Sequence, residues 1–466
     1  MTLLDAMRDR PLFGRWFEAE SWRAWFAFVA ALFALPMSEA EAAIYAACTG
    51  RTIPPPAPAR EAWLVVGRRG GKSRIAALIA VYLTAFRDHR AHLAPGEIAT
   101  VPVIAADRAQ ARTVMRYVRG FVESTPMLAE MVTTSTAEAI EFSNRSRIEV
   151  HTASFRSTRG YTLAGAILDE VAFWRSDETS AEPDREIIAG LRPGLATLPG
   201  ALLLAISSPY ARRGELWNAH SRHFGQDGDP VLVWQAPTRA MNDRIAADVI
   251  AAAYVEDEAS AAAEYGAEFR RDVEAFVSRE IVEACVVPGR YELPPMRAPR
   301  YFGFVDPSGG SQDAMTLAVA HQEGARVVID AVRERRPPFS PDDVVGEFAA
   351  TLRTYHCHTV TGDRYAGEWP RERFRAHGID YRVADRAKSD LYRDLLPLLT
   401  SARLELLDVS RLTAQLLGLE RRTARGGRDS IDHAPRSHDD VINAVAGVCA
   451  EGARADHTRL IEREIW

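Results

Sequence analysis

The chain has 466 residues, of which 47% are hydrophobic and 26% charged, and its formal net charge at pH 7 is −6. This length predicts two or three domains, and the composition is typical of a soluble globular protein. The net charge argues against a uniformly basic nucleic-acid coat, but 57 lysine and arginine residues still allow a local basic groove. The most apolar run, residues 24–35, is too short for a membrane helix of about 20 residues, so no membrane partner is expected. The four scattered cysteines indicate a reducing compartment, and we expect a cytoplasmic protein.

Residues 1–50 are predicted to be helical and to pack on the domain that follows them. They carry a crowded set of aromatic side chains: Trp16, Phe17, Trp22, Trp25, Phe26 and Phe28. Such an apolar face usually packs on neighbouring structure, and a docking surface for a partner is the alternative. Ser38 and Glu41 have the spacing of a capping box, which predicts a second helix from this point.

A phosphate-binding loop is predicted after the apolar run from Trp63 to Val66. The loop sequence is Gly67-Arg68-Arg69-Gly70-Gly71-Lys72-Ser73, and a helix-forming run follows it. Strand, glycine-rich turn and helix together let backbone N–H groups and a helix N-terminus bind phosphate. Lys72 would reach the β- and γ-phosphates of ATP, and the Ser73 hydroxyl would hold Mg²⁺. The standard spacing requires a glycine where Val66 stands, so a glycine-rich turn with a chance Lys-Ser pair is the alternative.

A second apolar run, residues 164–168, ends in Asp169 and Glu170. Acids at the carboxyl end of such a strand lie beside the phosphate loop in an α/β sheet. We expect Asp169 to contact Mg²⁺, directly or through water, and Glu170 to activate the water that attacks ATP. The alternative is a buried strand followed by two solvated acids. A third run, residues 201–206, ends in Ser207-Ser208-Pro209, whose hydroxyl groups either sense the γ-phosphate or simply begin a turn.

These segments predict an α/β fold with a P-loop ATPase core of the helicase-like, ASCE type over residues 51–210. A lid or linker region is expected over residues 211–298. Its proline-bearing end, from Tyr291 to Pro299, is expected to lead into a second domain over residues 299–466.

The second domain has the order of elements that is typical of an RNase H-like α/β nuclease. Three strands are predicted between residues 301 and 330, followed by a helix, a strand ending in Asp363, and a last helix that begins after Ser437-His438-Asp439-Asp440. Two Mg²⁺ or Mn²⁺ ions need a bridging carboxylate and one or two further oxygen ligands. Asp306 is the expected bridge, completed by Asp363 and by Asp440 or Asp439. The alternative role of Asp439 is a helix cap.

In their order and spacing, these motifs resemble those of the large terminase subunit of tailed bacteriophages, the motor and nuclease that packages viral DNA. The phosphate loop, Ile167-Leu168-Asp169-Glu170 and Ser207-Ser208-Pro209 are similar to the ATPase motifs of that family. Three further stretches are similar to the nuclease motifs of that family: Val305-Asp306-Pro307, Gly362-Asp363 and His438-Asp439-Asp440.

The resemblance implies that ATP hydrolysis drives double-stranded DNA into the procapsid and that a two-metal endonuclease cuts the concatemeric DNA. It implies ATP and Mg²⁺ as cofactors, with Mn²⁺ as an alternative in the nuclease, and the portal protein and a small terminase subunit as partners. The ATPase is expected to form a pentameric ring at the portal vertex in the host cytoplasm, with a monomer in solution left open. Family motors stabilise the transferring phosphoryl group with an arginine. Arg159 is the candidate acting on a neighbouring subunit, and Arg68 and Arg69 are the candidates within the loop.

Two other classes of protein remain open. The first is a cellular helicase or repair ATPase fused to an RNase H-like resolvase, and the second is a non-catalytic DNA-binding assembly protein with decayed sites. The presence of Lys72, Asp169, Glu170, Asp306 and Asp363 argues against decay.

Overall fold

The computed structural model describes residues 1–18, 20–153, 160–174, 183–311, 313–363, 368–423, 429–434 and 437–464. The chain divides into two compact units. Met1–Arg175 and Glu182–Arg271 belong to the first, and Asp272–Trp466 belongs to the second. The sequence placed this change at residues 298/299, whereas the structure has it at residues 271/272.

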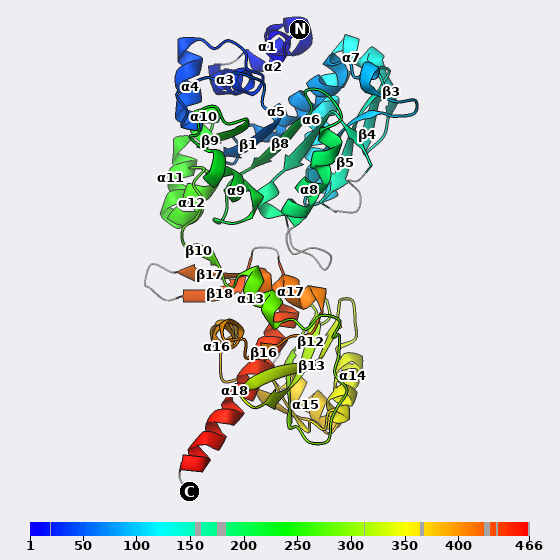
Figure 1. Cartoon of the computed structure of the whole chain (residues 1–466), viewed down its shortest axis with the longest axis vertical. Coiled ribbons are helices and arrows are strands. Elements are labelled where there is room, and N and C mark those ends of the chain that lie inside the picture. Colours follow the sequence, from blue (N-terminus) through cyan, green and yellow to red (C-terminus); the bar gives the residue numbers. More distant parts are fainter. Residues whose placement is uncertain are drawn as a thin grey trace. The chain divides into compact units, whose positions relative to one another are not determined.

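The first unit is built on a nine-stranded sheet with the order β3-β4-β5-β2-β7-β8-β1-β9, and β6 pairs with β2 (Figure 1). All neighbours from β5 to β9 are parallel, while the β3–β4 and β4–β5 pairs are antiparallel. The strands are β1 (Glu61–Val66), β2 (Ala99–Ala105), β3 (Val132–Ser135), β4 (Ala139–Phe142), β5 (Ser146–Thr152), β6 (Thr162–Leu163), β7 (Gly165–Asp169), β8 (Leu202–Ser207) and β9 (Val231–Ala236).

The strand order confirms the predicted ASCE-type ATPase fold, because β8 lies between the phosphate-loop strand β1 and the acid-tipped strand β7. A parallel sheet is covered on both faces, so its strands read as continuous apolar runs. Strands β2, β7 and β8 are buried along their whole length, which explains why the sequence revealed them. Strand β9 lies in the region predicted as lid or linker, yet it extends the same sheet beside β1.

Helices pack on both faces of this sheet (Figure 1). One core joins the sheet to the N-terminal helices, α5 and α6, and the other joins it to α8 and α9. The N-terminal helices thus share a core with the sheet, and Ser38 and Glu41 form the predicted capping box. The helices are α1 (Leu3–Arg8), α2 (Arg15–Phe17), α3 (Arg23–Leu32), α4 (Glu39–Thr49), α5 (Lys72–Val81), α6 (Arg108–Glu123), α7 (Pro126–Met131), α8 (Pro183–Leu195), α9 (Gly214–His223), α10 (Thr238–Met241), α11 (Ala247–Glu256) and α12 (Glu258–Glu264).

The second unit contains a six-stranded sheet with the order β15-β14-β11-β12-β13-β16. Strands β11, β12 and β13 form an antiparallel meander, and β14 and β15 continue the sheet in parallel on the other side of β11. This topology confirms the predicted RNase H-like fold. The strands are β11 (Tyr301–Asp306), β12 (Met315–Glu323), β13 (Arg326–Arg335), β14 (Thr359–Gly362), β15 (Asp380–Val383) and β16 (Leu404–Glu405).

A small second sheet explains where this unit begins. It has the order β10-β17-β18, formed by β10 (Val273–Ala275), β17 (Leu419–Thr423) and β18 (Asp429–His433). Strand β10 thus pairs with a strand near the other end of the unit, and Val282 and Cys285 of α13 (Arg279–Cys285) are buried in its core. Residues 272–298 are therefore part of the nuclease unit.

Two helices enclose the larger sheet of the second unit. Helix α14 packs on one face, and α18, which begins at Asp440, packs on the other, against β11 and β12. The approach of α18 is close, because a Cβ atom at Gly447 would lie 2.3 Å from the ring of Phe304. The remaining helices are α14 (Pro341–Thr354), α15 (Trp369–Ala376), α16 (Lys388–Thr400), α17 (Ser410–Leu417) and α18 (Asp440–Glu464).

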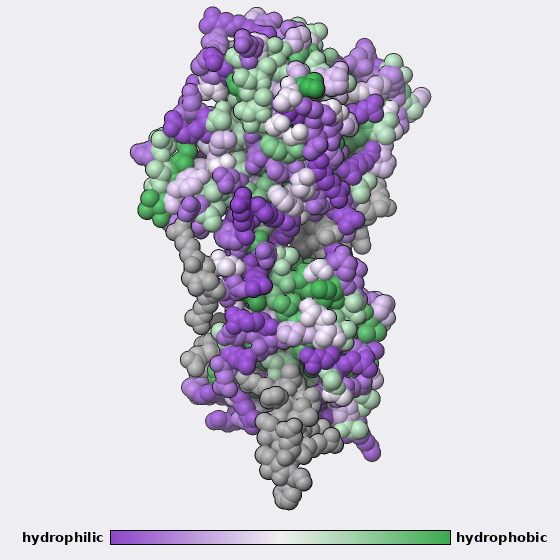
Figure 2. All heavy atoms as spheres, turned by 60° about the vertical axis from the view of Figure 1, so that its left-hand side comes forward, coloured by the Kyte–Doolittle hydropathy of each residue, from purple (hydrophilic) through white to green (hydrophobic). Residues whose placement is uncertain are grey.

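The visible face in Figure 2 mixes hydrophilic and hydrophobic residues. Most large hydrophobic side chains that are exposed stand singly, but α11 carries three of them, Val249, Tyr254 and Val255. Among the described residues, none of the helices combines the length and the apolar character that a membrane crossing requires.

Candidate functional site

The phosphate loop joins β1 to α5 through two residues in the left-handed region, Arg69 at φ 64° and Gly71 at φ 101°. Close packing requires glycine elsewhere in the loop, since a Cβ atom at Gly67 would lie 2.4 Å from Thr238 Oγ1 and one at Gly70 would lie 2.6 Å from Val66 Cγ1. Left-handed residues in such a turn direct successive N–H groups to one side, where they form a concave anion site. The loop therefore has the left-handed turns that phosphate-binding loops use, despite its non-standard spacing.

Lys72 begins α5, and only 5% of its surface is exposed. Its Nζ donates to Val66 O at 2.8 Å and to Ser208 Oγ at 3.0 Å, and it lies 3.7 Å from Glu170 Oε1. Burial lowers the pKa of Lys72, while the Glu170 and Asp169 carboxylates oppose that shift. A cation held at the start of a helix and beside an anion site is suited to bind a phosphate group.

Asp169 and Glu170 end β7 on the same edge of the sheet. Asp169 is 2% exposed, and burial, with the nearby Glu170 charge, raises its pKa to about 7. Its Oδ1 is buried and has no hydrogen-bond partner among the described residues. A buried oxygen without a partner is costly unless another ligand completes it. Asp169 therefore fits a Mg²⁺ ion bound with ATP, together with the partly buried Ser73 in the first turn of α5.

Glu170 is in the left-handed region at φ 49°, which strains a residue with a side chain and is common at functional sites. Its Oε2 accepts hydrogen bonds from Ser207 Oγ at 3.1 Å and from Ser208 N at 3.2 Å. The two serines that end β8 thus hold the carboxylate expected to activate water. The arrangement can couple the position of Glu170 to the position of Lys72, because Ser208 contacts both.

The three candidate arginines differ in their surroundings. The Arg68 guanidinium pairs with Glu264 at 3.2 Å. The Arg69 side chain is exposed, and the structure gives it no hydrogen bond or ion pair among the described residues. Arg159 lies outside the described residues, so its role in a neighbouring subunit stays a prediction.

The acid cluster of the second unit forms where β11 and β14 end and α18 begins. Asp306 ends β11, and β14 pairs in parallel with Val305 opposite Gly362, so Asp363 follows at the same edge. Asp440 begins α18, where its carbonyl accepts a hydrogen bond from Thr316 Oγ1 at 2.7 Å. Burial raises the pKa of Asp306 to about 8, and the charges of Asp363 and Asp440 add to this shift. The structure therefore brings the three predicted acids together, and their roles as metal ligands stay predictions.

Asn443 is a member of this site that sequence analysis missed. Its Nδ2 donates to Asp363 Oδ2 at 2.7 Å, and its hydrogen bond to Asp306 partly offsets the raised pKa of that acid. Asp440 and Asn443 are three residues apart on α18, so they lie on the same side of the helix. That spacing was the available signal for Asn443.

Asp439 has a different environment from Asp440. Its Oδ1 lies 2.6 Å from Lys388 Nζ, and its Oδ2 accepts from Tyr392 Oη at 2.8 Å. The side chain that caps α18 is that of Gln415, whose Oε1 accepts from Val441 N at 2.9 Å and from Ile442 N at 3.0 Å. The alternative of Asp439 as the helix cap is therefore replaced by a link to Lys388 and Tyr392.

The donor set fits divalent metal ions at Asp306, Asp363 and Asp440. Asp440 is 8% exposed, and its buried Oδ2 has no hydrogen-bond partner among the described residues, as expected for an oxygen aimed at a cation. Ligand atoms of Asp432, His433 and Asp439 also lie within 4.8 Å of one another. We assign no ion to that second group, because the Lys388 ammonium already neutralises Asp439.

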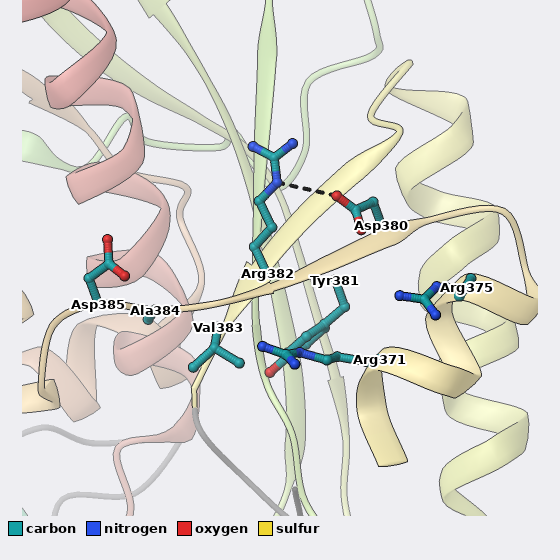
Figure 3. A pocket seen from close by; sticks show the side chains of 8 residues that line it. All are labelled: Arg371, Arg375, Asp380, Tyr381, Arg382, Val383, Ala384 and Asp385. Carbon is teal, nitrogen blue, oxygen red and sulfur yellow. Dashed lines mark hydrogen bonds and ion pairs between the residues drawn. The ribbon is translucent and has the colours of Figure 1, made fainter. Parts of the chain in front are cut away.

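An arginine-lined pocket of about 540 Å³ opens along β15, the edge strand beside β14 (Figure 3). Arg371 and Arg375 reach it from α15, and Arg382 from β15. Tyr381 connects the pocket to the acid cluster, because its hydroxyl donates to Asp363 O at 2.7 Å.

The two units thus define a chain that combines a P-loop ATPase fold with an RNase H-like nuclease fold. No protein-family model and no curated protein matches the sequence.

Among solved structures, the chain is similar to large terminases, as its motifs predict. The bacteriophage HK97 large terminase has 18% identity and a TM-score of 0.37, over 84% of this chain and 91% of that one. The large terminase of a thermophilic bacteriophage, in complex with ADP, has 12% identity and a TM-score of 0.38, over 83% and 92%. The large terminase nuclease from the thermophilic phage G20c, with bound magnesium, has 17% identity and a TM-score of 0.33, over 37% and 95%.

Proposed function

We propose that the chain is the large subunit of a bacteriophage terminase, which hydrolyses ATP to move double-stranded DNA into a procapsid and cuts that DNA with a metal-dependent nuclease. The observation that supports the proposal is that the acids and the lysine expected at two different sites are brought together in one chain. Lys72, Asp169 and Glu170 meet at one sheet edge, and Asp306, Asp363 and Asp440 are gathered in the second unit.

In the ATPase site, the loop N–H groups and Lys72 would hold the phosphates of ATP. Asp169 and Ser73 would bind Mg²⁺, which supplies charge neutralisation at the phosphates. Glu170 would orient and deprotonate the attacking water after its carboxylate leaves Ser207 and Ser208. Bound phosphates would compete with Ser208 and Glu170 for Lys72, which would remove the Lys72 charge from beside the Glu170 carboxylate.

In the nuclease site, Asp306 would bridge two Mg²⁺ or Mn²⁺ ions, with Asp363 and Asp440 as further ligands. The bound ions supply a hydroxide nucleophile and stabilise the leaving 3′-oxygen. Asn443 would orient Asp363 by its hydrogen bond, and Lys388 would keep Asp439 neutralised next to the cluster.

The arginine-lined pocket is a proposed contact for the DNA backbone beside the cleaved bond. Val383, which lines the pocket, pairs with Gly362, the residue before Asp363, so the pocket lining lies on the strand next to the one that carries this acid. We expect Arg375→Ala to lower the slope of log affinity against log salt by about 0.9, the effect of one lost phosphate contact. Arg373→Ala is the matched control, because Arg373 lies on the same helix but pairs with Asp342 outside the pocket. Equal slopes for both variants would remove the pocket from the DNA path.

The proposed assembly is a pentameric ring on the portal protein, with a small terminase subunit that selects the viral DNA. Arg159 is the proposed phosphoryl-stabilising residue supplied to the neighbouring subunit. Mixing Arg159→Ala protein with Glu170→Gln protein tests this role, since assembled mixed rings would regain some hydrolysis. A strong defect in Arg69→Ala without any such rescue would move the role to the loop.

Incubation of the purified protein with plasmid DNA tests the proposal most directly. We expect cleavage that needs Mg²⁺ or Mn²⁺ and survives Lys72→Ala, and ATP hydrolysis that survives Asp306→Ala. Processive strand separation on a nicked duplex would instead favour a helicase fused to a resolvase. Full cleavage by Asp306→Ala at several Mn²⁺ concentrations would contradict the nuclease assignment.

A further inference from the structure

The carbonyl groups of the phosphate loop are held by three side chains from two other parts of the first unit, α3 and the two ends of α10. Thr238 Oγ1 donates to Arg68 O at 2.8 Å, Asn242 Nδ2 donates to Arg69 O at 2.9 Å, and Trp25 Nε1 donates to Gly70 O at 3.0 Å. Three consecutive carbonyls are therefore bound from outside the loop, each by a different side chain.

We propose that Trp25, Thr238 and Asn242 are positioning residues for nucleotide, which fix the loop carbonyls outward so that the loop N–H groups face the phosphates. The inference rests on the proposed ATPase function and adds three residues that no sequence motif contains. Each peptide unit carries its N–H opposite its C=O, so binding the carbonyl on one side determines where the next N–H points. A loop that lacks the standard glycine spacing has particular need of such restraint.

Each of the three donors is itself well fixed. Trp25 is fully buried, packs edge-on against Phe28, and lies so close to the loop that a Cβ atom at Gly71 would be 3.1 Å from its Nε1. Thr238 is fully buried at the start of α10, and its N–H donates to Tyr265 O at 2.8 Å. The orientation of the Asn242 amide is set by its Oδ1, which accepts from Arg244 N at 3.2 Å. Donors fixed in this way lose little entropy when they hold the loop.

The backbone of the loop is anchored in the same direction at its start. Gly67 N donates to Ala236 O at 3.1 Å, and Arg68 N donates to Glu264 O at 2.5 Å. Gly70 N donates to Gly67 O at 3.1 Å within the loop. These three bonds use N–H groups of the loop for structure. The N–H groups from Gly71 to Ser73, at the start of α5, are then the ones available to an anion.

The experiment measures the affinity of full-length variants for ADP and ATP with Mg²⁺, together with their melting temperatures. Trp25→Phe keeps an aromatic side chain but removes the indole N–H together with the five-membered ring, and Thr238→Val keeps the shape and removes the hydroxyl. We expect each to weaken nucleotide binding about three- to tenfold, the range for one hydrogen bond, and Thr238→Ser to restore the wild-type affinity. Asn242→Ala at a partly exposed position should act likewise with little risk to folding.

Matched controls separate positioning from general stability. Trp63→Phe removes a buried indole whose Nε1 donates to Glu61 Oε1 at 2.9 Å, and Thr84→Val removes a buried hydroxyl that donates to the backbone carbonyls of Ala80 and Val81. These controls should lower the melting temperature about as much as the variants of Trp25, Thr238 and Asn242, but they should leave nucleotide affinity unchanged. Suppose that nucleotide affinity is unchanged in Trp25→Phe, Thr238→Val and Asn242→Ala but abolished in Lys72→Ala. That result would overturn the positioning role of the three residues and leave the ATPase function standing. A wild-type protein that binds no nucleotide would instead overturn the ATPase function.

Discussion

Neutralising Asp306 should abolish DNA cleavage and at the same time stabilise the metal-free protein. The carboxyl has a pKa raised from 3.8 to about 8, mainly by burial and further by Asp363 and Asp440. A raised pKa in the folded state means that ionisation opposes folding. The penalty is absent below about pH 4, grows as the pH rises, and is complete once the pH passes about 8.

The size of the effect follows from that shift. At pH 7 the difference from 3.8 is about three units, worth up to about 4 kcal/mol at 1.36 kcal/mol per unit. Part of this penalty belongs to the coupled ionisation of Asp363 and Asp440, so we halve the figure. We therefore expect Asp306→Asn to increase the free energy of unfolding by on the order of 2 kcal/mol. For a unit of about 200 residues, that gain raises the melting temperature by roughly 4–8 °C.

Scanning calorimetry of the full-length protein in EDTA at pH 5 and pH 8 measures this effect. The D306N variant should melt higher than wild type at pH 8, and the difference should shrink at pH 5. Added Mg²⁺ should stabilise the wild type and not the variant, because bound metal removes the penalty. The exposed Asp343→Asn in the same unit is the control. If D306N melts at the same temperature as wild type or lower at pH 8, the assignment of a raised pKa to the buried Asp306 carboxyl is refuted.

Three further predictions concern single positions and the unit boundary. Glu170→Gln should reduce ATP turnover by several orders of magnitude yet still bind nucleotide, as measured by phosphate release and by equilibrium binding, and near-normal turnover would contradict its role as the base. Asp440→Asn should abolish plasmid cleavage. Asp439→Asn should leave measurable cleavage but lower the melting temperature, because it removes the contacts with Lys388 and Tyr392. A greater loss of cleavage in Asp439→Asn than in Asp440→Asn would make Asp439 the metal ligand. A fragment from Asp272 should fold and cleave DNA, while one from Pro299 should be unstable because it lacks β10 and α13, and equal circular dichroism and melting of the two fragments would contradict this boundary.

The sequence predicted those features that depend on neighbours along the chain. The buried parallel strands appear as apolar runs, and the acids that end β7, β11 and β14 directly follow such runs. Both fold classes and the position of each acid-bearing strand could therefore be predicted. The apolar run of β9 was not recognised as a strand, although it pairs with β1 and extends the sheet of the first unit.

Contacts between distant parts of the chain could not be predicted in this way. Gln415 caps α18 from another helix, and the cap position itself is occupied by Asp439, whose partners are Lys388 and Tyr392. Nothing in the local sequence distinguishes such a glutamine from any other polar residue on a helix. The same reason hides Trp25, which lies 45 residues before the carbonyl that it binds.

In the proposed ATPase site, the internal partners of Lys72 compete with the nucleotide phosphates for its ammonium group. The ammonium already donates hydrogen bonds to Val66 O and Ser208 Oγ and lies near Glu170. A phosphate that binds Lys72 must therefore replace these partners. The net gain on binding is therefore smaller than the strength of a lysine–phosphate contact. In the proposed ATPase cycle, the same internal partners would be available to the ammonium again once the terminal phosphate has left. In the proposed packaging motor such an exchange would favour turnover, because each cycle can begin only after the previous nucleotide has left.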